Sequence, residues 1–195
     1  RDSSTSRGLG DVYKRQIHGK GVRVIWLKGE TDMLGALEEV ESFGEFAKRN
    51  NAVASTEVKS FEHLICTEQL SRRLGFKVGE ELIRVVRVRS LNGNARQVDH
   101  GYFLESIAKG LTPEIAAKSI YDYLEHKRGV KVMASRRTVS VELANDEDCS
   151  YLDLGKYNCV AVMESQSYTS DGILFEVTHA RTHPEIFHYR VNSKR

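Results

Sequence analysis

Two arginines spaced two residues apart, Arg87 and Arg89, are the residues of this sequence whose chemistry is easiest to interpret. They lie in the β-rich stretch 82–91, where side chains two apart share one face of a strand. Paired guanidinium groups match the geometry of a phosphate better than lysine does. The pattern allows an anion site, but on its own it favours the solvated face of an antiparallel strand, with Arg84 as a third arginine.

Cysteine and histidine show no pattern of metal ligation. The three cysteines are odd in number and lack CxxC spacing, which argues against both a disulfide framework and a zinc site. The histidines are scattered without ligand spacing. We therefore expect neither a bound metal nor a cofactor.

Composition narrows the class of protein. The chain has 195 residues, of which 40% are hydrophobic and 29% charged, as is usual for a globular domain. It contains neither an apolar run of about 20 residues nor a secretory signal, which favours a cytoplasmic protein without membrane contact. Beyond residue 24 there are 23 Lys and Arg against 25 Asp and Glu, so this part does not resemble a nucleic-acid surface.

Helical and strand patterns alternate along the chain, and turn signals separate neighbouring strands. Asn92-Gly93 and Ser170-Asp171-Gly172 each predict a hairpin. We predict an α+β fold in which helices pack on one side of an antiparallel sheet. The predicted helices are 38–50, 67–74, 112–126 and 145–152, and the predicted strands are 53–65, 82–91, 97–104, 130–143, 158–168, 173–181 and 187–191.

The first residues differ from the rest. Residues 1–16 have no hydrophobic period, so we assign them no structure; they resemble a stretch that precedes unrelated truncated translations, or are an ordinary flexible tail. In residues 17–26, Gly19 and Gly21 flank Lys20 before a short β-branched strand, as in a hairpin tip. The main domain is predicted over residues 27–195.

Several short sequence motifs, in a fixed order along the chain, resemble those of a known family. They are Ser42-Phe43, the pattern I-R-x-x-R-x-R over 83–89, Ser119-Ile120-Tyr121, Asp171-Gly172, Phe175-Glu176 and R-x-H-x-E-x-F over 181–187. Together they resemble the UTRA domain, the chorismate-lyase-like sensor of GntR-type regulators of the HutC branch. Within that branch the repressors of trehalose operons look most similar.

The resemblance implies a function. It suggests the ligand-binding and dimerising domain of a transcriptional repressor that releases operator DNA when it binds a sugar phosphate, with trehalose 6-phosphate as first choice. Glucosamine 6-phosphate and N-acetylglucosamine 6-phosphate are alternatives. Operator DNA would be bound by a winged-helix head, of which residues 17–26, with Lys20, resemble the end of the wing.

The resemblance also implies a site. Arg87 and Arg89, with Ser42 and Ser119, would hold the phosphate; Ser42 and Ser119 could instead be helix caps alone. The predicted sugar side consists of Glu176, Arg181, Tyr168 and His183. Glu176 could alternatively be a cross-strand salt-bridge partner, and His183 a solvated loop residue.

Two other classes of function stay open. One is an enzyme, because the family fold resembles chorismate lyase and arginines with a glutamate suit a carboxylate substrate. No paired acid and base stand out, so we predict no catalysis. The other is a dimerisation module with a vestigial pocket.

Overall fold

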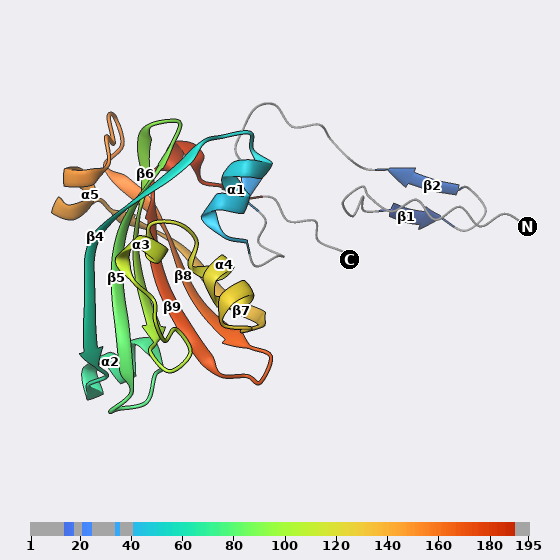
Figure 1. Ribbon diagram of the computed structural model, residues 1–195. Helices are drawn as coiled ribbons and strands as arrows, with labels where there is room; N and C mark the ends of the chain where they lie inside the picture. Colours follow the sequence, from blue (N-terminus) through green and yellow to red (C-terminus); the bar gives the residue numbers. More distant parts are fainter. Residues whose placement is uncertain (1–13, 18–20, 25–33, 36–40, 190–195) are drawn as a thin grey trace, which may run out of the picture. The chain divides into compact units, whose positions relative to one another are not determined.

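The computed structural model, which we describe for residues 14–17, 21–24, 34–35 and 41–189, divides the chain into two compact units (Figure 1). The first, residues 1–32, contains an antiparallel hairpin of β1 (Lys14–Ile17) and β2 (Gly21–Val24). A strand from residue 14 contradicts the prediction of no structure up to residue 16. Lys20 lies outside the described residues.

A six-stranded antiparallel sheet dominates the second unit, residues 33–195, as the sequence predicted. Its order is β4-β5-β6-β9-β8-β7, so β4 and β7 form the two edges. The strands are β4 (Ala54–Ile65), β5 (Glu81–Leu91), β6 (Asn94–Leu104), β7 (Val132–Leu143), β8 (Cys159–Thr169) and β9 (Leu174–Thr182).

Helices cover both faces of this sheet, which corrects the prediction of helices on one side only. On one face lie α1 (Phe43–Arg49), α3 (Pro113–Ala116) and α4 (Ile120–Asp122), which continues into the π-helix η1 (Tyr123–Lys127). On the other lie α2 (Glu68–Leu74) and α5 (Asp146–Tyr151). Both faces need cover because β5 buries Val85 and Val86, neighbours that point in opposite directions.

Side-chain caps fix where the helices begin. Ser42, Thr67, Thr112, Ser119 and Asn145 each accept a hydrogen bond from a backbone N–H in the first turn. The cap at Ser119 starts a new helix, where the sequence predicted one continuous region over 112–126. The predicted cap at Thr67 is confirmed.

The hairpin at Asn92-Gly93 is confirmed, with φ of 51° and 83° at its two central residues. Positive φ at both positions is the signature of a tight turn whose twist matches that of the strands. Between Arg89 and Ser90 the pairing of β5 with β6 shifts by one residue. This bulge sets Asp99, rather than Val98, opposite Arg87.

The last described segment does not extend the main sheet. After β9 the chain forms the short helix η2 (Pro184–Ile186) and β10 (His188–Tyr189), which pairs with β3 (Leu34–Gly35). The sequence predicted a strand over 187–191, of which residues 190 and 191 lie outside the described part.

The two edges of the sheet differ in character. On β4, a register shift lies between Val58 and Ser60, and Lys59 pairs with Glu57. On β7, four large apolar side chains are exposed, namely Met133, Val139, Val141 and Leu143. Among the described residues, no helix has the length and apolar character needed to cross a membrane.

Candidate functional site

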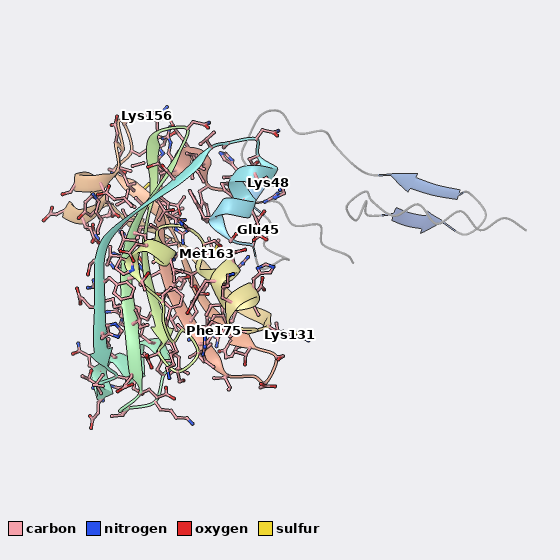
Figure 2. All side chains as sticks on the ribbon, in the orientation of Figure 1. Glu45, Lys48, Lys131, Lys156, Met163 and Phe175 are labelled. Atoms are coloured by element: carbon pink, nitrogen blue, oxygen red, sulfur yellow. The ribbon has the colours of Figure 1, made fainter. Side chains whose placement is uncertain are left out.

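A cavity of about 160 Å³ lies over the sheet face that carries Arg87. Its floor comes from β5, β6, β9, β8 and β7, and helices α1 and α4 contribute to its walls. Figure 2 shows the central floor residue Met163 and marks α1 by Glu45 and Lys48.

Arg87 and Arg89 form an ionic cluster with Asp99 at one corner of this floor. The Nη2 atoms of Arg87 and Arg89 donate to the same oxygen, Oδ2 of Asp99, at 2.5 and 2.8 Å. The Arg87 and Asp99 side chains are 4% and 3% exposed, so this pair is almost fully desolvated. The prediction that the two arginines share one face is thus confirmed.

The charges of this cluster stabilise each other. Burial alone would raise the pKa of Asp99, but the two guanidinium groups outweigh burial and lower it to about 2. Burial and the neighbouring Arg89 lower the pKa of Arg87, which still remains charged near neutral pH. Two cations and one carboxylate leave an excess positive charge for an incoming anion.

Glu176 lies further along the floor and is held by a tyrosine. The hydroxyl of Tyr121 donates to Oε2 of Glu176 at 2.5 Å and lies 3.1 Å from Oγ of Ser167. Burial raises the pKa of Glu176 against the effect of these hydrogen bonds. The pKa of Tyr121 is also raised, first by burial and then by Glu176. Glu176 therefore offers a buried carboxyl group next to the cavity, not an exposed salt bridge.

Ser42 and Ser119 both line the cavity and both cap helices. The Ser42 hydroxyl accepts from the backbone N–H of Glu45, and the Ser119 hydroxyl accepts from that of Asp122. Phe43, next to Ser42, packs its ring against the Arg89 guanidinium at 5.1 Å. Capping thus brings the starts of α1 and α4 to the cavity.

Two buried polar atoms have no hydrogen-bond partner within the described part of the chain. They are Nε of Arg87 and Oγ of Ser135, and both residues line the cavity. A buried polar group without a partner typically costs about 1–3 kcal/mol. Such groups are rare in folded proteins, and both of these belong to residues that line the same cavity.

Arg181 and Tyr168 lie away from this cavity, contrary to the prediction that they close its sugar side. Arg181 donates to Asp148 at 2.9 Å and also bonds Glu142 and the carbonyl of Leu143. Tyr168 donates to the side chain of Gln166. The reason is the period of the strand: Arg181 is five residues from Glu176, so it faces the other side of the sheet.

His183 is also outside the cavity lining, and it is not a solvated loop residue. It is 2% exposed, and its ring packs at 5.4 Å against the ring of Tyr157. Nε2 lies 3.0 Å from the carbonyl of Asp153, and Nδ1 accepts from the backbone N–H of Glu185. Both ring nitrogens of His183 therefore lie within hydrogen-bonding distance of backbone groups, one at Asp153 and one in η2.

Several cavity residues escaped the sequence analysis. They are Asp99, Tyr121, Ser135, Arg137, Ser165, Gln97 and Thr178. Alternation could have found Thr178, because it lies two residues after Glu176 on β9 and therefore faces the same side. Asp99 reaches the floor through the bulge at Arg96 of β6, which no sequence pattern announces. No cluster of three or more potential metal ligands exists among the residues described.

Comparison with known proteins identifies the family of this chain. The family model of the UTRA domain matches residues 49–188. The HTH-type transcriptional regulator TreR of Bacillus subtilis is 27% identical over 177 residues, which cover 91% of this chain and 73% of the relative. The repressor NagR of the same organism is 22% identical over 86% of this chain and 66% of its own length.

Solved structures show the same fold. The effector binding domain of the B. subtilis trehalose repressor TreR superposes with a TM-score of 0.64 at 27% identity, over 72% of this chain and 98% of that domain. YydK of B. subtilis superposes with a TM-score of 0.76 at 23% identity, over 93% of this chain and 76% of that structure. The chain therefore belongs to the UTRA domain family, the effector-binding domains of GntR-type transcriptional regulators.

Proposed function

We propose that the cavity binds a phosphorylated sugar and that the chain is the sensing part of a repressor. The observation that carries the proposal is the pair Arg87 and Arg89, which both bond Asp99 and line the cavity. A phosphate dianion suits this site, because charge-assisted bonds to guanidinium are strong where water is excluded.

Trehalose 6-phosphate is the proposed effector. The similarity to a trehalose repressor over most of the chain supports this choice. Glucosamine 6-phosphate and N-acetylglucosamine 6-phosphate are the second candidates, because Glu176 lines the cavity and its carboxyl group can accept a hydrogen bond from an amine or amide. We propose binding without turnover, so the ligand should be recovered unchanged.

The proposed mechanism is a shift between two arrangements of a homodimer. The ligand binds one arrangement more tightly, and that arrangement holds paired winged-helix heads at a spacing unsuited to the operator. A coupling free energy of about 1–3 kcal/mol suffices for such regulation. The hairpin β1–β2 is consistent with the end of a wing, and we propose that residues 17–26 belong to such a head.

Calorimetric titration of the wild-type chain with the three sugar phosphates tests the proposal, using Arg89→Gln as the disabled variant. Arg89 is chosen because Asp99 keeps Arg87 as its partner when Arg89 is replaced. Loss of a charge-assisted hydrogen bond typically costs about 1.5–3 kcal/mol, so affinity should fall roughly 10- to 150-fold.

Arg84→Gln is the matched control. Arg84 lies on the same strand but the opposite face, where it pairs with Glu62 at 3.2 Å, so affinity should stay at the wild-type value. Absence of binding of all three sugar phosphates to the wild-type chain, or equal affinity in wild type and Arg89→Gln, would refute the proposed site.

A further inference from the structure

A second cavity, of about 190 Å³, lies on the face of the sheet opposite the cavity of Arg87. It extends from α2 to the edge strand β7. Strand alternation places it there: Arg136, which lines the second cavity, stands between Ser135 and Arg137, which line the first. The lining residues used below are Arg73, Leu74, Tyr102, Arg136, Glu164, Gln166 and His179. The two cavities therefore lie back to back on the same strands.

At one end of the second cavity, Tyr102 and Arg73 place two donors side by side. Tyr102 is 6% exposed, and the guanidinium of Arg73 lies over its ring at 5.6 Å. Nη2 of Arg73 donates to the Tyr102 hydroxyl at 3.2 Å. Among the described residues, the proton of that hydroxyl has no acceptor and Arg73 has no carboxylate partner. A buried phenol and a guanidinium thus present hydrogen-bond donors to the cavity without an anion to receive them.

The charges around the cavity do not balance. Arg136 makes no hydrogen bond or ion pair with any residue that the structure describes. Of the described residues in the lining, only Glu164 carries a carboxylate, and it lies 3.9 Å from the ring of His179. Burial lowers the pKa of His179, which is therefore neutral near neutral pH. Two guanidinium groups against one carboxylate leave an excess positive charge.

The amide of Gln166, in the middle of the cavity, is already in use. Its Nε2 donates to the carbonyl of Leu74 at 3.3 Å, and its Oε1 accepts from the Tyr168 hydroxyl at 3.4 Å. The hydrogen-bonding capacity left at the two ends of the cavity is that of donors. Donors combined with excess positive charge are complementary to negatively charged acceptor atoms.

We infer that this cavity is a second ligand site, which binds a small organic anion carrying carboxylate or phosphate groups. Arg73 and Tyr102 bind one acidic group, and Arg136 offers a further contact from β7. A guanidinium has five N–H donors, so the anion uses only part of either arginine. The second site does not depend on a sugar phosphate in the first cavity.

The test uses the Arg89→Gln variant, in which the anion site of the first cavity is weakened. Its melting temperature is measured at low ionic strength with millimolar citrate, glycerol 3-phosphate or glycerol. Citrate carries carboxylates, glycerol 3-phosphate carries a phosphate and glycerol carries neither. At least one of the two anions should raise the melting temperature, and glycerol should not. The more effective anion identifies the acidic group, and calorimetric titration with it gives the affinity.

Two further changes in the same variant locate the binding. Arg73→Gln should lower the affinity for the effective anion roughly 10- to 150-fold, as expected for a lost charge-assisted hydrogen bond. Tyr102→Phe keeps the ring and the net charge, and it should lower the affinity roughly 10-fold because the hydroxyl donor is gone. Melting without ligand checks that both variants are folded.

Arg72→Gln is the matched control. Arg72 is adjacent to Arg73 but outside the cavity lining, and it pairs with Glu68 at 3.6 Å. The change of charge is the same, so general effects of salt act equally on both variants, and Arg72→Gln should keep the affinity. Stabilisation by neither anion would overturn the second site. Equal losses in Arg72→Gln and Arg73→Gln, or unchanged affinity in Tyr102→Phe, would also overturn it.

Discussion

At the scale of single residues, the site depends on charges kept away from water. Asp99 is ionised because two arginines face it, whereas Glu176 lies close by with a raised pKa because burial dominates there. Similar carboxyl groups thus have different protonation tendencies on one cavity floor. Neither difference follows from the sequence, because both depend on which side chains the sheet brings opposite each other.

Glu176→Gln should make the ligand-free protein more stable at neutral pH. The folded-state pKa of Glu176 is raised, so its contribution to stability is fully present below the ordinary value of about 4.3 and is lost as pH rises through the folded-state value. Glutamine stays neutral and can still accept from Tyr121. Melting temperatures measured from pH 4 to pH 8 should therefore diverge, with the variant above wild type at the upper end.

A gap between the two melting curves that is constant over this pH range would contradict the raised pKa. Tyr121→Phe is a useful companion, because it removes the donor of the 2.5 Å bond and leaves the Glu176 carboxyl with fewer partners. This second variant should lower stability at neutral pH, whereas Glu176→Gln should raise it.

At the scale of elements, sequence patterns predicted well where helices and strands lie along the chain. They predicted poorly which face of the sheet a helix or a side chain occupies. Turn residues and caps act locally, so Asn92-Gly93 and Thr67 could be recognised without the fold. The predicted position of Arg181 in the site was wrong, because Arg181 is five residues from Glu176 on β9 and therefore lies on the opposite face of the sheet. The bulge beside Arg89 could not be predicted, since a bulge depends on packing between two strands.

Gly101 on β6 gives a prediction at this scale. A Cβ at this position would lie 2.7 Å from the ring of Phe103, which is fully buried. Gly101→Ala must move that ring, which lies on the same face of the sheet as the cavity, and overpacking of this kind typically costs about 1–3 kcal/mol. Chemical denaturation should show a lower midpoint, and Phe103→Leu in the same chain should restore part of the loss.

Gly44→Ala provides the contrast, because nothing among the described residues lies within 4 Å of a Cβ at that position in α1. It should raise stability by about 0.5–1 kcal/mol, the usual difference between glycine and alanine in a helix. If Gly101→Ala and Gly44→Ala changed stability equally, the Phe103 ring would be able to move without loss of stability, which would contradict the prediction.

At the scale of the whole molecule, the exposed apolar side chains of β7 support the proposed homodimer. A twofold axis at Val139 would pair β7 with the same strand of a second copy and set Arg136 opposite the second copy's Glu142. An isologous interface needs this kind of self-complementary surface. Because Ser135 and Arg137 lie on the same strand, ligand binding and dimer geometry would share one structural element.

Val139→Lys should disrupt this dimer. A residue at the twofold axis meets its own copy, so the variant would place two like charges against each other across the edge. Light scattering after size exclusion should give the mass of one 22.1 kDa chain for the variant and twice that mass for wild type. Val53→Lys, which changes another exposed valine outside β7, should remain dimeric. A dimeric Val139→Lys would rule out this interface.

The unequal edges of the sheet bear on how many copies can join. At β4 the register shift near Lys59, with charged side chains around it, discourages a neighbouring strand from adding there. If both edge strands could pair with another copy, copies could add edge to edge without limit, as in a fibre. If only β7 can pair, the proposed homodimer would bury this edge in both copies, and assembly would stop at two chains.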